Sequence, residues 1–580
     1  MVVFVEKCNF VGDKSIYHNM KRLELMLCTL IFVTLCAIGK ERTKAEMINI
    51  ARGVLLTTNG AKAKGYGEPV MQLVKSSERL GVVAAEGYGF VVVNRNDMGR
   101  PVLGFSQTDY DADNLPEGLV WWLETTEDAL SKGIMGAYDS DILCVDETIE
   151  NFVSTTWDQG QPYNDKCPNV KKGTTKSKAP VGCVATSMAQ IINYFKYPAK
   201  GQGSGTYSVV NGTDTTFVKA LVNGTYQYDK LKDTYSKTET DKEPISTLMF
   251  DAGKACNMQY EYGGSGATLI DCAKGMAYNF SYDSLAINYY AKMCHTDKEW
   301  FTMVKNELTG KKPILYSGTT KTNGGHAFIL SGLNTEGMVW VNWGWSGSGD
   351  GWYAIDHLAT EKYDFSNNNE MLIGFTPQAS PIPGEENISQ LYYLSEDYLE
   401  LKKVGRNVFT KPFYYYNFGW RVFSGDVRMV LEDEDTKKVE YSYIQSSENI
   451  IEAYWGIGFN NDINIREFFT NTFKFGLVEG HYKVWAECKS KEENEWRTIT
   501  RINDHTACSW FAVAADGSVT INNNESTTDI TAVTKENDDN TSEIYDLNGR
   551  KLDNIVPANA AANRKIVIVK KGKSVEKKEF

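Results

Sequence analysis

The segment that most constrains this chain is an apolar helix pattern that begins at a cysteine. Apolar residues recur at helical spacing from Val184 to Phe195, and Pro180 and Gly182 precede them, so we expect a helix beginning at or just after Cys183. A thiol at a helix N-terminus faces the positive end of the helix dipole and unpaired N–H groups, which favour the thiolate. This position suits a nucleophile, although a small core residue is the commoner role of such a cysteine.

A nucleophilic cysteine needs a base, and the chain has six histidines. His326 stands in a Gly-Gly-His-Ala-Phe-Ile-Leu segment, where two glycines let a substrate backbone approach and an apolar strand holds the imidazole. The alternative is a histidine that only ends a strand. The others lie before the apolar N-terminal run, in polar or surface segments, or in the β-rich C-terminal region (His18, His295, His357, His481 and His505).

A second strand pattern, residues 338–345, follows a turn near Asn334 and predicts a hairpin with the His326 strand. With the turn centred on Asn334, Asn342 lies opposite His326 and its amide oxygen can accept a hydrogen bond from the ring. Trp343 would shield that bond from water, or would simply be a core aromatic. His326 follows Cys183 by 143 residues and Asn342 follows His326 by 16, and this order and approximate spacing agree with papain-like enzymes.

An acyl-transfer site also needs hydrogen-bond donors aimed at the developing oxyanion. Gln159 lies shortly before Cys183 in a Thr-Trp-Asp-Gln segment, and its side-chain amide is our candidate to join the Cys183 backbone N–H in an oxyanion hole. The alternative is an ordinary loop glutamine. The sequence contains no Cys-x-x-Cys, Gly-x-Ser-x-Gly, Gly-x4-Gly-Lys-Ser/Thr or His-Glu-x-x-His pattern, so we expect neither a metal nor a cofactor.

Length and changes of pattern divide the 580 residues into several parts. A basic start at Met20, a short apolar run and a small residue at its end predict a signal peptide, with a lipoprotein anchor through Cys36 as the alternative. The formal net charge of −13 argues against a nucleic-acid partner, which would need clustered Lys and Arg. The expected fold class is α+β, with these parts: 1–39, the signal region; 40–150, a small α+β unit and a linker; 151–380, the catalytic unit; 381–525, a β-sandwich; 526–580, a small β domain.

Several motifs of the catalytic unit together resemble the streptopain family of papain-fold cysteine peptidases. They are Trp157-Asp-Gln, Gly182-Cys-Val-Ala-Thr, Tyr262-Gly-Gly-Ser-Gly-Ala, Lys312-Pro-Ile-Leu-Tyr-Ser-Gly, Gly324-Gly-His-Ala-Phe and Val341-Asn-Trp-Gly-Trp-Ser-Gly. The resemblance implies a papain-like domain with endopeptidase activity on protein or peptide substrates. It also implies Cys183 as nucleophile, His326 as base, Asn342 as the orienting amide and Gln159 as oxyanion donor.

The same resemblance implies a substrate cleft and a preference for a hydrophobic side chain two residues before the scissile bond. The glycine-rich loop of this cleft is equally expected as a plain turn. Residues 41–135 resemble the family's propeptide, an intramolecular inhibitor that covers the active site of a zymogen, with cleavage between Lys132 and Val153. The candidate substrate-binding residues are Gly263, Gly264, Ser265, Gly266, Gly325 and Trp343.

The segment that begins at Ile544 with Ile-Tyr-Asp-Leu-Asn-Gly-Arg is similar to sorting tails of the type IX secretion route. The outer-membrane secretion machinery is therefore a candidate partner, and the expected location is secreted or at the cell surface. Two other function classes stay open. One is a surface adhesin in which the β-sandwich binds a ligand and the papain-like unit is vestigial. The other is a transglutaminase or amidase that uses the same Cys–His pair.

Overall fold

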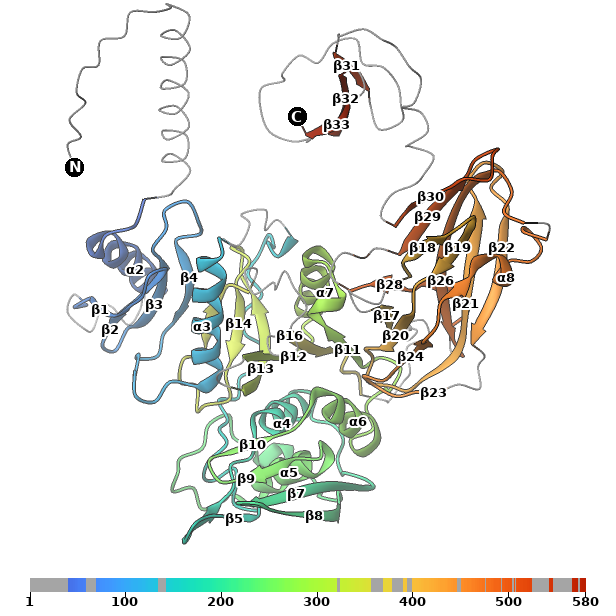
Figure 1. Ribbon diagram of the computed structural model, residues 1–580. Coiled ribbons are helices and arrows are strands. Elements are labelled where there is room, and N and C mark those ends of the chain that lie inside the picture. Colours follow the sequence, from blue (N-terminus) through green and yellow to red (C-terminus); the bar gives the residue numbers. More distant parts are fainter. Residues whose placement is uncertain are drawn as a thin grey trace, which may run out of the picture.

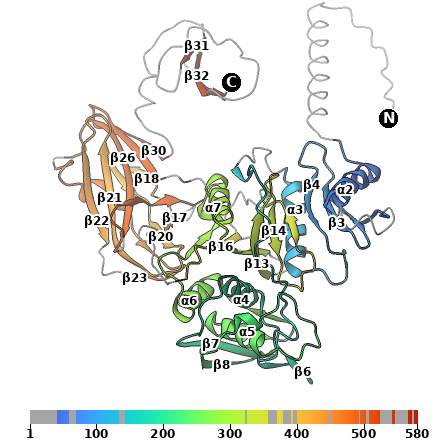
Figure 2. The ribbon, with the colours of Figure 1, turned by 180° about the vertical axis from the view of Figure 1, so that it is seen from behind.

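The structure of the protein is a computed structural model, shown from two sides in Figures 1 and 2. It describes residues 40–58, 69–133, 142–320, 324–355, 369–377, 390–393, 399–445, 450–474, 476–491, 493–502, 505, 507–523, 542–545, 566–571 and 574–579. The candidate signal region 1–39 and much of the candidate sorting tail lie outside these ranges, as does His357. None of the helices in the described ranges is long and apolar enough to cross a membrane.

A single ten-stranded sheet runs through both the N-terminal unit and the catalytic unit (Figure 1). Its two halves meet where β4 pairs with β15, with Phe105 opposite Trp352. The two parts that the sequence separates therefore share one sheet, and the N-terminal unit lies beside the catalytic unit. The strands, in sheet order, are β1 (Gln72–Ser76), β2 (Leu80–Ala85), β3 (Gly89–Asn94), β4 (Val102–Ser106), β15 (Gly351–Tyr353), β14 (Val339–Asn342), β13 (Gly324–Leu333), β12 (Ile314–Thr320), β16 (Asn369–Ile373) and β11 (Asn288–Ala291).

Successive residues of β13 face opposite sides of this sheet, because side chains alternate along a strand. Ala327 and Ile329 belong to the core on the side of α4 (Cys183–Phe195). Phe328 and Leu330 belong to the core on the side of α3 (Glu117–Ser131) and α7 (Asp297–Thr309). His326 lies two residues before Phe328, so its side chain lies on the same face of the sheet, toward α3.

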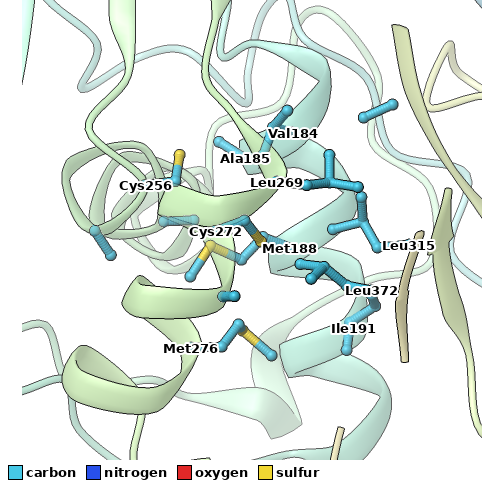
Figure 3. Packing of buried hydrophobic residues seen from close by; sticks show 14 of the residues in the cluster. Val184, Ala185, Met188, Ile191, Cys256, Leu269, Cys272, Met276, Leu315 and Leu372 are labelled. Atoms are coloured by element: carbon cyan, nitrogen blue, oxygen red, sulfur yellow. The ribbon is translucent and has the colours of Figure 1, made fainter. Parts of the chain in front are cut away.

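The helical part of the catalytic unit packs under the sheet around α4. Figure 3 shows Met188 and Ile191 of α4 between Cys272 and Met276 on one side and Leu315 and Leu372 of the sheet on the other. The helix predicted to begin at or just after Cys183 is confirmed as α4. Its apolar face packs on α6 and on the ten-stranded sheet. The other elements here are β5 (Asn169–Lys172), β6 (Thr175–Lys178), β7 (Ser204–Asn211), β8 (Asp214–Leu221), α5 (Glu243–Ala255), β9 (Gln259–Glu261), β10 (Gly264–Gly266) and α6 (Leu269–Asn279).

The N-terminal unit, expected to be α+β, contains α2 (Lys44–Thr58) and α3 beside its strands. Met47, Ala51 and Leu55 of α2 pack on Val83 and Val91. The opposite face of these strands joins the α3 core, which also contains Phe328 and residues of α7. One hydrophobic core therefore links the N-terminal and catalytic units.

Residues 391–522 form a β-rich unit in which a seven-stranded sheet and two smaller sheets share one core. The tail adds a separate three-stranded sheet. The elements are β17 (Leu391–Tyr393), β18 (Leu401–Val404), β19 (Asn407–Thr410), β20 (Phe413–Asn417), β21 (Phe423–Asp433), β22 (Val439–Gln445), β23 (Ile450–Ile451), β24 (Gly456–Phe459), β25 (Ile463–Asn464), α8 (Ile465–Phe468), β26 (Gly480–Ser490), β27 (Arg497–Thr498), β28 (Thr500–Arg501), β29 (Cys508–Val513), β30 (Val519–Asn522), β31 (Ser542–Tyr545), β32 (Ile566–Lys571) and β33 (Ser574–Glu579).

Candidate active site

Cys183 is the first residue of α4 and carries a free, partly exposed thiol. The preceding Gly182 has φ +92°, and a Cβ there would lie 2.9 Å from the Ser265 carbonyl oxygen. Only glycine fits this position comfortably, because L side chains rarely adopt that φ and the space is filled. The turn therefore fixes the thiol beside the loop that contains Ser265.

The pKa of the Cys183 thiol lies above its ordinary value, although we expected the helix N-terminus to favour the thiolate. Burial is the main cause, and the negative charge of Glu117 adds to it, while hydrogen bonds with the backbone of Ala327 and Val184 act in the opposite direction. Desolvation of the anion thus outweighs the donors at the helix end. The surroundings of Cys183 in this structure therefore disfavour the thiolate.

His326 lies at the start of β13 next to Ala327, and it lines the same cleft as Cys183. The structure thus brings together the predicted nucleophile and base, which are far apart in the sequence. The Nδ1 atom of His326 lies 3.3 Å from Oε2 of Glu117, which comes from the first turn of α3. Glu117 was not predicted at this site from the sequence, because it belongs to a different unit.

The predicted pairing of Asn342 with His326 is wrong. In the hairpin of β13 and β14, Asn342 lies opposite Ile329, because the turn is centred two residues after Asn334, where the Asn334 backbone N–H donates to the Met338 carbonyl oxygen. The amide of Asn342 is buried and donates to the carbonyl oxygen of Thr155 at 2.6 Å and to Oε1 of Gln190 at 3.1 Å. Its oxygen accepts from the backbone N–H of Gly344 at 3.0 Å. These bonds, rather than one to the imidazole, fix Asn342 here.

Gln159 lies on the loop that precedes the nucleophile. Its carbonyl oxygen accepts a hydrogen bond from the backbone N–H of Val181 at 2.9 Å, two residues before Cys183. Asp158 holds the same loop by accepting from the backbone N–H groups of Gln159 and Gly160. The backbone of Gln159 is therefore tied to the turn that presents the thiol, as a neighbouring oxyanion donor requires.

Trp343 is buried in the core between β14 and the N-terminal unit. Its indole N–H donates to the carbonyl oxygen of Gly349 at 3.0 Å, and its ring stacks at a tilt on Phe328 with 4.8 Å between ring centroids. A Cβ added to Gly118 of α3 would lie 2.7 Å from this ring, so the helix backbone rests directly on the indole. Trp343 therefore acts as a core aromatic in this structure, and it does not line the cleft described next.

A cleft of about 330 Å³ opens beside Cys183 and His326. Of the predicted substrate-binding residues, Ser265, Gly266 and Gly325 line it, whereas Gly263 and Gly264 lie in and after the β9–β10 turn and do not. Sequence reasoning missed the contributions of β12, α6, β16 and the β-rich unit, since nothing local in these segments marks them. The remaining lining residues are Val184, Ala267, Thr268, Leu269, Ile270, Ser317, Thr319, Ala327, Glu370 and Tyr454.

Across the part of the chain that the structure describes, no three His, Cys, Asp or Glu side chains gather closely enough to hold a metal ion. The cleft itself offers a thiol from Cys183 and an imidazole from His326. Such a set serves nucleophilic attack on an acyl carbon.

Residues 157–353 match the model of the Peptidase C10 family. The matched segment begins at Trp157 and ends with the last residue of β15. It contains Cys183, His326, Asn342 and Gln159, but it leaves out the N-terminal unit and the β-rich unit.

Three known proteins illustrate the similarity. The thiol protease/hemagglutinin PrtT of Porphyromonas gingivalis is 29% identical over 51% of this chain, which spans only 36% of PrtT. Streptopain of Streptococcus pyogenes is 27% identical over 47% of this chain and 72% of its own length. A solved fragment of Prevotella intermedia prointerpain A is 31% identical, with 53% of this chain and 99% of that fragment covered and a TM-score of 0.46.

Proposed function

The chain belongs to the Peptidase C10 family, the streptopain family of cysteine peptidases, and from this premise we propose that it is a cysteine endopeptidase made as an inactive precursor. Cys183 is the nucleophile and His326 its general base. The observation that carries this proposal is the shared cleft, in which one thiol and one imidazole from distant segments face the same space.

The reaction follows from the positions of these groups. His326 takes the proton of the Cys183 thiol, and the sulfur attacks the carbonyl carbon of the peptide bond. The Gln159 side chain and the Cys183 backbone N–H donate to the oxyanion, and His326 then protonates the departing amine. Water, deprotonated by His326, releases the acyl group and restores the thiol.

The N-terminal unit acts as an inhibitory propeptide in this proposal. Glu117 of α3 contacts His326, and its charge helps to raise the pKa of the Cys183 thiol. Cleavage between Lys132 and Val153 would separate α3 from the catalytic unit and release both effects. Asn342 would orient His326 only in the mature enzyme, after the imidazole leaves Glu117.

The apolar walls of the cleft support a preference for a hydrophobic side chain two residues before the scissile bond. Val184, Leu269 and Ile270 all line it. We further propose export of the precursor by the signal peptide that begins at Met20 and recognition of the tail after Ile544 by outer-membrane secretion machinery.

One labelling experiment tests the nucleophile and the processing together. Purified precursor is incubated under reducing conditions with a thiol-directed active-site probe, beside its Cys183→Ala variant and a Cys508→Ala control. Cys508 is also partly exposed, but it lies in the β-rich unit. The proposal expects processing and labelling of the wild type and the control, with neither in Cys183→Ala. Equal labelling of all three would rule out Cys183 as the nucleophile and leave an adhesin function as the better account.

A further inference from the structure

One wall of the cleft comes from the β-rich unit. Tyr454 lies on the turn between β23 and β24, and it lines the cleft together with Cys183, His326 and Glu370. The residue is 128 positions beyond His326 in the sequence and lies outside the segment that matches the family model. A residue of the β-rich unit therefore lines the cleft in which the substrate is expected to lie.

The turn holds Tyr454 in an unusual backbone conformation. Its φ of +62° lies in the left-handed region, which a bulky side chain rarely adopts. Asn417 fixes the turn: its carbonyl oxygen accepts from the backbone N–H of Tyr454 at 2.7 Å, and its side chain donates to the carbonyl oxygen of Ile451 at 2.9 Å. Asn417 also donates its backbone N–H to the carbonyl oxygen of Trp455 at 3.0 Å. The position of Tyr454 is thus set by several bonds.

The hydroxyl of Tyr454 contacts two groups of the catalytic unit. It donates to Oε1 of Glu370 at 3.1 Å and also contacts the hydroxyl of Tyr289. Burial and the neighbouring Glu370 raise the pKa of Tyr454, so the phenol remains a hydrogen-bond donor at any physiological pH. Edge-to-face ring contacts with Tyr289 and Phe418, at 6.1 and 5.8 Å between centroids, fix the ring plane.

The β-rich unit is anchored firmly beside this wall. Trp420 is only 2% exposed, and its indole N–H donates to the carbonyl oxygen of Ile287 at 2.8 Å. Phe418, Trp420 and Ile502 belong to the same buried core as Ile287 of the catalytic unit. An apolar contact of this kind keeps Tyr454 in place without help from a substrate.

We propose that the β-rich unit takes part in substrate selection and that Tyr454 determines which side chain the cleft accepts. The inference rests on the proposed peptidase function and names its specificity element. Glu370 is the one carboxylate among the described residues that line the cleft. The Tyr454 hydroxyl engages this carboxylate, so the cleft selects an uncharged side chain over a cationic one. The Tyr454 ring takes up part of the cleft lining and limits the size of that side chain.

The test compares the full-length mature forms of wild type, Tyr454→Phe, Tyr454→Ala and the control Trp455→Ala. Trp455 shares the turn but is 70% exposed and does not line the cleft. Each form is assayed on peptides that differ only at the residue two before the scissile bond, which is Leu, Phe or Lys. Because Tyr454→Phe keeps the ring and removes the hydroxyl that contacts Glu370 and Tyr289, it should lower the Leu-to-Lys ratio of kcat/KM by about tenfold. Tyr454→Ala should also raise the Phe-to-Leu ratio, and Trp455→Ala should change neither.

Active-site titration with the thiol-directed probe separates the two claims. Equal titration of all forms, with ratios within twofold of wild type in both Tyr454 variants, overturns the role of Tyr454 and leaves the peptidase function intact. Absence of probe reaction and hydrolysis in wild type overturns both. Mass measurement should show residues 391–522 retained in the mature enzyme, and loss of this unit with unchanged selectivity would also contradict the inference.

Discussion

The carboxylate of Glu117 lies 3.3 Å from Nδ1 of His326, and the two residues come from opposite sides of the expected cleavage linker. The contact places a negative charge of the N-terminal unit against the proposed base. In the proposed zymogen, this contact must break before His326 can act as the base.

Replacing Glu117 with Gln should make the precursor thiol more reactive. The charge of Glu117 raises the pKa of Cys183, so its removal lowers that pKa and increases the thiolate fraction near pH 7. We expect alkylation of Cys183 to become about two- to tenfold faster. Rates measured by mass spectrometry across pH 6–9 report this change, and Glu124→Gln, on the exposed side of the same helix, should leave them unaltered. Equal rates in both variants would remove Glu117 from the inhibitory account.

Replacing Gln159 with Ala should slow catalysis and leave substrate binding nearly unchanged. The loss of an oxyanion-hole donor typically lowers kcat by about 10²–10³-fold, because the bond forms mainly in the transition state. Steady-state kinetics of the titrated mature enzyme measure this effect. Gln161→Ala, exposed on the same loop, is the matched control. A Gln159→Ala enzyme that keeps its kcat would show that other groups stabilise the oxyanion.

Replacing Asn342 with Ala should destabilise the fold. The buried amide satisfies Thr155, Gln190 and Gly344, and the loss of such a partner costs about 1–3 kcal/mol per buried group left unpaired. Thermal melting of the precursor should show the loss. Gln190→Met removes the hydrogen bond between Asn342 and Gln190 but keeps the Asn342 side chain. It therefore separates a structural role of Asn342 from a role in orienting His326. If Asn342 also orients His326 after maturation, Asn342→Ala will lower kcat well beyond Gln190→Met, and equal kcat values would limit Asn342 to a structural role.

Asp350 should make precursor stability depend on pH. Burial raises the pKa of Asp350 to about 7, partly offset by the Trp343 backbone N–H that donates to it. In the unfolded chain this carboxyl titrates near about 4. Between these values the folded protein keeps a proton that the unfolded chain has released, so the Asp350 contribution is full below about pH 4 and is lost as pH rises toward 7.

The variant Asp350→Asn should remove this dependence. Its melting temperature relative to wild type should therefore rise from pH 4 to pH 7 and level off above, because the free energy of unfolding of the wild type falls over this range by at most about 1.4 kcal/mol per pH unit. Differential scanning fluorimetry across this range provides the comparison, and Asp128→Asn, on the surface of α3, should show no such trend. A pH-independent difference between Asp350→Asn and wild type would contradict the buried, protonated carboxyl.

The local parts of this structure were predictable from the sequence because their signals are local. The apolar period of the segment after Gly182 predicted α4, and the strand patterns on either side of Asn334 predicted the hairpin of β13 and β14. The register of this hairpin was not predictable, because several residues of the connecting segment are typical of turns, and the turn is centred two residues after Asn334. This difference in turn position moved Asn342 away from His326.

The contacts that define the cleft were harder to foresee, because they join distant segments. Glu117 is an ordinary acidic residue in a helix first turn, and Tyr454 is one of many tyrosines in a β-rich region. Their roles depend on how whole units pack together. Gly118 of α3 lies on Trp343, and the β-rich unit contacts Ile287 of the catalytic unit through Trp420. Neither docking follows from the residues that flank Glu117 or Tyr454.

The most direct test of the central claim is hydrolysis of a protein substrate by mature Cys183→Ala and His326→Ala. Both variants are matured in trans by a trace of wild-type enzyme, which is then removed, and His481→Ala, altered in the β-rich unit, is the control. We predict that the control matches wild type and that kcat/KM of the other two falls by at least about 10³-fold. Full activity in either Cys183→Ala or His326→Ala would contradict the assignment of nucleophile and base.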